Sequence, residues 1–308
     1  MIERIETTFL SEVDQLPISL LTVRPVGEPK GMIQFAHGMC ENKERYIPFM
    51  EYLAEHGYLC RIHDHRGHGR SVKSKEDLGY MYKSGAYGIL KDMKTINQAM
   101  HEEYPDLPLI LFGHSMGSLA VRAYARKYDE TIDALIVCGS PSNNPGRGIG
   151  EGIAKMESLL LGSKHKSKVL TMMSMGPYQQ RFKKEPSLVA WLCTDEQVQK
   201  EYEQSEYCGF MFTDDAYLAL FQLMKKAYDV KNWNCTKPNL PVLFISGEED
   251  PCMVNIRQFA KSVRAMRSAG YRDVRGKVYR GMRHEILNEK NHEKVYHDVL
   301  SYLKKKGF

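Results

Sequence analysis

The sequence predicts an α/β fold, with a mostly parallel central sheet flanked by helices. Three observations support this prediction. Short apolar segments alternate along the chain with segments of helical periodicity, which is typical of α/β folds. Several apolar segments lack polar alternation, as expected of strands covered on both faces in a parallel sheet. The alternation fails once, between Pro141 and Pro238, where a long helical stretch is inserted.

The segments assigned to strands are short and rich in branched or aromatic residues, whereas those assigned to helices repeat apolar residues every three or four positions. The predicted strands are 18–23, 32–37, 58–63, 108–112, 134–139, 241–246 and 275–280. The predicted helices are 45–56, 84–104, 116–128, 254–269 and 286–305.

The insertion divides the chain into a core, residues 1–140 and 239–308, and a helical cap, residues 141–238, which follows the sixth core strand at 134–139. A cap at the carboxyl end of a sheet would cover a site there. Its methionines adapt to varied apolar shapes and could line an acyl pocket, with Met175 and Met211 as candidate substrate contacts. Alternatively, they form the cap's own core. The cap methionines considered are Met156, Met172, Met173, Met175, Met211 and Met224.

The strongest chemical signal is Gly113-His114-Ser115-Met116-Gly117, between an apolar strand and a predicted helix. A nucleophilic serine must be presented on a sharp turn, and flanking glycines permit both that turn and close packing behind it. The adjacent helix N-terminus favours the negative charge that develops during acyl transfer. Ser115 is therefore the predicted nucleophile.

A nucleophilic serine needs a base and a carboxylate, in the chain order Ser, Asp or Glu, His. Asp250 follows the strand 241–246 and is preferred as the carboxylate over its neighbours Glu248 and Glu249. His284 follows the last predicted strand. The two histidines beyond it, His292 and His297, lie in a polar pattern on the C-terminal helix and are expected to face solvent.

The oxyanion hole of such an enzyme requires two backbone N–H donors. One is expected from Met116, directly after the nucleophile, and the other from Met39, in the loop after the strand 32–37. Gly38 would let this loop turn toward the substrate. Gly38 and Cys40 are therefore further candidate substrate contacts.

Five segments, HGMCENKERY (37–46), HDHRGHGRS (63–71), GHSMGS (113–118), GEEDP (247–251) and YRGMRHEILNE (279–289), resemble those of monoacylglycerol lipases and related lysophospholipase-like hydrolases. The resemblance implies the α/β-hydrolase fold, a cap over an acyl tunnel, no cofactor or metal, and an acyl-ester or lipid substrate. It implies the triad Ser115, Asp250 and His284 with Met39 and Met116 as oxyanion donors. Cys40 and Ser118 stand where the family often has glycine, which affects the expected pocket shape.

Other interpretations remain open. The same machinery serves carboxylesterases for short or aromatic acyl groups, thioesterases, aminopeptidase-like amidases and acyltransferases. A non-enzymatic binding protein on this scaffold would not need all three triad residues. Residues His63 to His68 resemble the H-x-H-x-D-H signature of binuclear metallohydrolases, but Gly67 replaces its second aspartate. We therefore expect the histidines of this segment to form local hydrogen bonds.

Composition indicates a cytoplasmic protein. The N-terminus lacks an apolar signal region, no apolar run would span a bilayer, and seven cysteines form no C-x-x-C pair. A thiol reagent at Cys40 or Cys252 would block the site if either thiol is accessible; otherwise both are inert.

The net charge is +5, and nine Lys or Arg with one acid, Asp273, lie between Arg257 and Arg283. This segment is either a solvated surface or one that attracts anionic lipid head groups. Base-stacking aromatic residues are missing from it, which argues against nucleic acid. Monomer and dimer are both compatible with the sequence.

Overall fold

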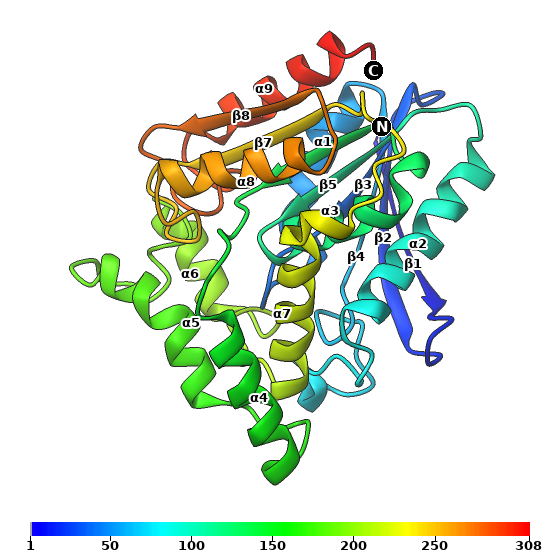
Figure 1. Ribbon diagram of the computed structural model, residues 1–308. Coiled ribbons are helices and arrows are strands. Elements are labelled where there is room, and N and C mark those ends of the chain that lie inside the picture. The colour runs from blue at the N-terminus through cyan, green and yellow to red at the C-terminus, as the bar shows by residue number, and fades with distance from the viewer. Residues whose placement is uncertain (1) are drawn as a thin grey trace.

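A computed structural model describes residues 2–308 and contains one twisted eight-stranded sheet (Figure 1). The strand order is β1-β2-β4-β3-β5-β6-β7-β8. The strands are β1 Glu3–Leu10, β2 Pro17–Arg24, β3 Gly31–Ala36, β4 Tyr58–His63, β5 Leu109–His114, β6 Ala134–Cys138, β7 Val242–Gly247 and β8 Val274–Tyr279.

The sheet is parallel from β4 across to β8 and antiparallel only where β1 and β2 join its edge. The predicted α/β-hydrolase fold is confirmed, and β3 to β7 are buried along their whole lengths. β1 was missed because its residues are mostly exposed and polar. It depends on pairing with β2 rather than on an apolar pattern of its own.

Helices cover both faces of the sheet. Buried side chains of α1 and α9 pack on one face, and those of α2, α3 and α8 pack on the other. The core helices are α1 Ile47–Glu55, α2 Gly85–Glu103, α3 Met116–Tyr128, α8 Ile256–Ser268 and α9 His292–Lys305. Short 3-10 helices lie at Lys43–Tyr46, Lys75–Asp77, Asp129–Thr131 and Val230–Asn232.

The predicted start of the last helix was wrong. α9 begins at His292 rather than at 286, because the Glu289 carboxylate accepts hydrogen bonds from Arg283 N at 2.6 Å and Thr194 N at 2.9 Å, which holds this segment in a turn. On α8, Phe259, Val263 and Met266 are buried, whereas Ile256 at the helix start is exposed. The basic residues of α8 face solvent.

The segment between β6 and β7 is helical: α4 Arg147–Leu161, α5 Lys168–Arg181, α6 Glu196–Gln204 and α7 Asp214–Tyr228. α4, α5 and α6 project from one end of the sheet in Figure 1. α7 contacts α2 and α3 of the core as well as α4. The division at 141 and 238 remains our proposal, and α7 packs against helices on both sides of it.

Candidate active site

Ser115 lies at the sharp turn between β5 and α3. Its backbone has φ 53° and ψ −117°, a conformation that L-residues rarely adopt, and its N–H donates to Cys138 O at 3.0 Å. Such strain persists where the surrounding structure fixes it, and it concentrates at functional sites. The strand–turn–helix setting expected from the sequence is therefore present.

The glycines on either side of Ser115 allow three backbones to meet. A Cβ at Gly117 would lie 2.0 Å from Ala36 O on β3, and one at Gly113 would lie 2.4 Å from Gly117 O. Neither position has room for a side chain. The close packing of α3 against β3 and β5 is what holds the strained turn.

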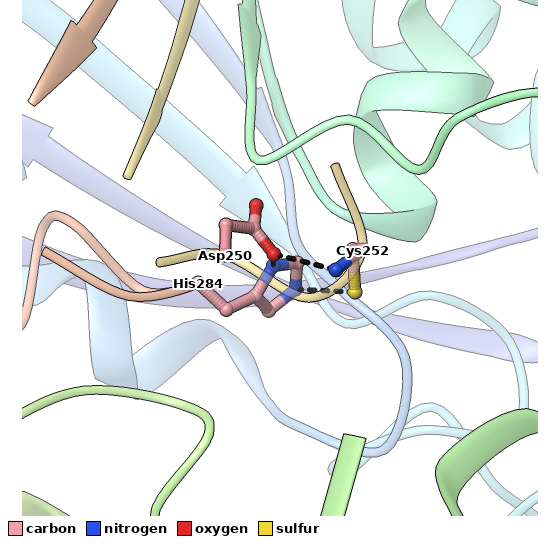
Figure 2. A group of neighbouring side chains, drawn as sticks. All are labelled: Asp250, Cys252 and His284. Atoms are coloured by element: carbon pink, nitrogen blue, oxygen red, sulfur yellow. Dashed lines mark hydrogen bonds and ion pairs between the residues drawn. The ribbon is translucent and has the colours of Figure 1, made fainter. Parts of the chain in front are cut away.

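Asp250 and His284 come together from the loops after β7 and β8 (Figure 2). His284 Nδ1 lies 2.9 Å from Asp250 Oδ1, and both side chains are buried. Asp250 also accepts from Ser246 Oγ at 2.9 Å and from Cys252 N at 2.8 Å. These bonds fix the carboxylate, which in turn fixes the orientation of the imidazole.

The competing residues do not reach this position. Glu248 is exposed, and Glu249 lies 3.7 Å from the Arg283 guanidinium. On α9, His297 is exposed and His292 bonds through Nδ1 to Glu289 O at 2.7 Å. Only Asp250 and His284 form the expected pair.

Burial disfavours both charged forms of this pair, but mutual attraction outweighs it. Burial alone would lower the pKa of His284, yet the Asp250 charge and hydrogen bond raise it above its ordinary value. Burial would raise the pKa of Asp250, yet His284 lowers it. An imidazolium at this position is therefore stabilised, as a general base requires when it takes a proton.

His284 Nε2 faces Cys252 Sγ at 3.8 Å, as Figure 2 shows. Within residues 2–308 no hydrogen bond joins His284 to Ser115, although both line one cavity. Catalytic hydrogen bonds are often long without substrate and tighten when it binds. Cys252, which the sequence places two residues after Asp250, thus lies against the His284 ring itself.

The loop after β3 passes directly over Ser115. A Cβ at Gly38 would lie 3.1 Å from Ser115 Cβ, and Gly38 N donates to Glu41 Oε1 at 2.5 Å. The N–H groups of Met39 and Met116 donate to no other group of the described chain. Two backbone donors beside Ser115 are therefore available for a substrate oxygen.

A buried ionic network, which sequence reasoning missed, holds this loop against the His284 loop. Arg45 forks onto Glu285 with N–O distances of 2.5 and 2.6 Å and contacts Glu41 at 3.0 Å. Tyr46 Oη donates to Glu41 at 2.8 Å, and His114 Nδ1 lies 3.3 Å from it.

Burial alone would raise the pKa of Glu41, but His114 and the Arg45 charge lower it well below its usual range. Glu41 is therefore a buried carboxylate that positions Gly38. Its presence within HGMCENKERY was the only signal.

A cavity of about 530 Å³ opens at Ser115 beneath the cap. All four candidate substrate contacts, Gly38, Cys40, Met175 and Met211, line it. Met173 and Met224 do so too, whereas Met156 and Met172 are exposed and take neither of the two expected roles. The other apolar or aromatic lining residues include Tyr178, Val189, Trp191, Leu192, Phe210, Phe212, Tyr217, Leu220 and Phe221.

Two cap residues contact the loop that carries His284. The Trp191 ring centroid lies 5.3 Å from that of His284, and Trp191 O accepts from His284 N at 3.5 Å. Glu285 N donates to Leu192 O at 2.6 Å. The cap therefore helps to place the base.

Cys40 adopts φ 55°, in the left-handed region that favours glycine. This explains why glycine is common here in the family that the sequence resembles, and it gives this chain a strained, thiol-bearing wall. Ser118 is accommodated by donating from Oγ to Ser115 O at 2.5 Å.

The prediction of local hydrogen bonds for the histidine-rich segment was wrong for His63 and His65. Their ring nitrogens are buried and, within the described residues, have no partner; the rings instead pack together at 4.7 Å. His68 Nδ1 does lie 3.1 Å from Arg66 O. Burial lowers the pKa of all three, so the rings are neutral and pack as apolar groups.

The metallohydrolase interpretation finds no support in the described part of the chain. Two groups of side chains in that part of the chain could hold a metal ion. One is Asp250, Cys252 and His284, and the other is Glu157, His165 and Asp214. Neither includes a histidine of 63–68. The first cluster is the Asp–His pair already described, and the second lies in the cap.

Comparison with known proteins shows the family to which the chain belongs. Residues 27–291 match the family model described as serine aminopeptidase, S33. A monoacylglycerol lipase of Mycolicibacterium smegmatis is 26% identical over 284 residues, covering 91% of this chain and 90% of the relative. Monoglyceride lipase of Homo sapiens is 29% identical over 155 residues, covering 50% of this chain and 47% of the relative.

Solved structures agree on the fold. A thermostable carboxyl esterase from Bacillus coagulans gives a TM-score of 0.91 at 23% identity over 99% of both chains. A soluble variant of Saccharomyces cerevisiae monoglyceride lipase gives 0.74 at 19% identity over 99% of this chain and 95% of the other. The chain therefore belongs to the serine aminopeptidase S33 family and is an α/β-hydrolase similar to the monoacylglycerol lipases.

Proposed function

We propose that this protein is a serine hydrolase of carboxylic acyl esters that works through an acyl-serine intermediate. One observation carries the proposal: a single apolar cavity brings together Ser115, the Asp250–His284 pair and the free N–H groups of Met39 and Met116. The named activities of the relatives, monoacylglycerol lipase and carboxyl esterase, support it.

The mechanism follows from this arrangement. His284 takes the hydroxyl proton as Ser115 attacks the ester carbonyl, and Asp250 stabilises the imidazolium. Met39 N and Met116 N bind the oxyanion, where losing one donor costs about 3 kcal/mol. His284 then protonates the leaving alcohol and activates the water that hydrolyses the acyl-enzyme.

The preferred substrate is a monoacylglycerol or lysophospholipid. The cavity wall is dominated by aromatic side chains and methionines, which suit an acyl chain. The carboxylates in its lining, Glu41 and Glu285, are both paired with Arg45, which leaves no free anion there to bind a peptide's α-amino group. This favours an ester over an aminopeptidase substrate.

A carboxylesterase or thioesterase on short or aromatic acyl groups is the alternative, since the catalytic groups would be the same. p-Nitrophenyl esters of graded chain length, run beside monoacylglycerol, lysophosphatidylcholine, an acyl thioester and an aminoacyl anilide, separate these functions. We expect rates to rise with acyl length. Fastest turnover of the anilide would refute the ester assignment.

We further propose that the cap contacts a lipid surface. Leu159, Leu160 and Met172 on α4 and α5 are 85%, 74% and 69% exposed. Exposed apolar side chains gathered on neighbouring helices suit insertion at a lipid interface.

No helix within residues 2–308 is both long and apolar enough to cross a membrane. Seven unpaired cysteines suit the expected cytoplasmic location.

A further inference from the structure

Three ligand-type side chains meet inside the cap, away from the catalytic residues. Glu157 comes from α4, His165 from the α4–α5 connection and Asp214 from the first turn of α7. One donor atom from each lies within 4.8 Å of the others. His165 Nδ1 lies 3.0 Å from Asp214 Oδ2.

Each of the two carboxylates has a buried oxygen without a hydrogen-bond partner in the described residues. Asp214 is 0% exposed, and its Oδ1 has no hydrogen-bond partner in residues 2–308; the buried Oε2 of Glu157 has none either. Ionised carboxylates only accept hydrogen bonds, so two of them side by side in a buried place need a shared proton or a cation.

We propose that Glu157, His165 and Asp214 form a divalent-cation site that fastens the cap. Two carboxylates and one imidazole suit Zn²⁺, Mn²⁺ or Co²⁺ better than Mg²⁺ or Ca²⁺, which prefer oxygen ligands alone. The His165 side chain is 31% exposed, so the ion and its remaining water ligands have access. This site is structural and independent of the proposed esterase reaction.

The consequence of binding is local rigidity. The ion would join α4 and the α4–α5 connection to α7, whose Tyr217, Phe221 and Met224 line the catalytic cavity. Lys164, Lys166 and Lys168 are exposed beside the cluster. The rate of trypsin cleavage at these lysines therefore reports how often the α4–α5 connection separates locally from α7.

The test uses the full chain after chelator treatment, with Mn²⁺ binding followed by calorimetry and trypsin cleavage of 164–168 followed by mass spectrometry. We expect one Mn²⁺ per chain and about tenfold slower cleavage when it is bound. Glu157→Gln keeps a donor for Asp214 but removes a ligand, so its Mn²⁺ affinity should fall at least about tenfold. Glu151→Gln, also on α4 but paired with Lys155 outside the cluster, should bind normally.

Zn²⁺ is tested in Cys252→Ala, because the catalytic cluster offers a second thiol–imidazole site. The proposal is overturned if neither ion binds, if Glu157→Gln binds as tightly as wild type, or if Glu151→Gln loses as much affinity. If neither ion binds and metal-free Glu157→Gln is more stable than metal-free wild type, the two carboxylates share a proton instead. None of these readouts depends on ester turnover.

Discussion

The Ser115 turn and the outer face of the cap are built on opposite principles. At the turn, Gly113 and Gly117 admit no Cβ, and buried bonds fix Glu41, Asp250 and His284. On the cap, leucines and methionines of α4 and α5 stand exposed. The turn is fixed by many contacts, whereas the outer surface of the cap is fixed by few.

The largest effect is expected when the proposed nucleophile is removed. Ser115→Ala should lower kcat by about 10⁶-fold, the loss seen when a triad serine is removed elsewhere. It should also abolish labelling by a fluorophosphonate. The circular dichroism spectrum serves as the folding control, and a residual rate above about a hundredth of wild type would refute Ser115 as nucleophile.

A smaller loss is expected when the oxyanion loop is freed without touching the triad. Glu41→Gln weakens the bonds to Gly38, Arg45 and His114, so kcat should fall about 10²-fold with little change in KM. Glu44→Gln, in the same segment but paired with Lys43, is the matched control. Equal effects of the two substitutions would contradict a positioning role for Glu41.

The pH profile probes the buried pair. Turnover needs neutral His284, so kcat/KM should fall about tenfold per unit on the acid side of its pKa. Because Asp250 raises that pKa, the fall should begin above the ordinary histidine value. Asp250→Asn should move the inflection downward, and a rate that is flat between about pH 5 and 8 would exclude a histidine base.

Changes on the cap should discriminate between substrates rather than abolish chemistry. Leu159→Ser with Leu160→Ser should reduce vesicle binding and monoacylglycerol turnover by about tenfold, from the apolar area lost. Turnover of a soluble short p-nitrophenyl ester should stay within about twofold of wild type, because substitutions of exposed residues usually change the stability of the fold little. Equal losses on both substrates would show that these leucines support the fold instead.

The smallest effect is expected from thiol reagents. Burial raises the pKa of Cys40 and Cys252 well above the ordinary thiol value, so little thiolate is present at neutral pH. Iodoacetamide should leave most activity intact over a time in which exposed thiols react. Rapid loss of activity, prevented in Cys252→Ala, would show that the thiol facing His284 is reactive.

The sequence by itself determined the fold class and the chain order of the residues that we propose as catalytic. Apolar segments of strand length, broken by helical periodicity, are local patterns, and the G-x-S-x-G turn carries its own steric reason in Gly113 and Gly117. Asp250 and His284 could be named because each follows a predicted strand, and parallel strands bring their carboxyl ends to one edge. β1 lacked such a pattern and was missed.

Only the tertiary structure decided what depends on distant partners. The Glu41–Arg45–Glu285 network joins residues 240 positions apart, and nothing local in the chain indicates that pairing. The same holds for the contact of Cys252 with His284 and for the tilted Trp191 ring of the cap beside that imidazole. It also holds for the cluster of Glu157 and Asp214. Burial and charge pairing are properties of the assembled fold, so local patterns could indicate the candidate residues but not the contacts that shift their pKa values.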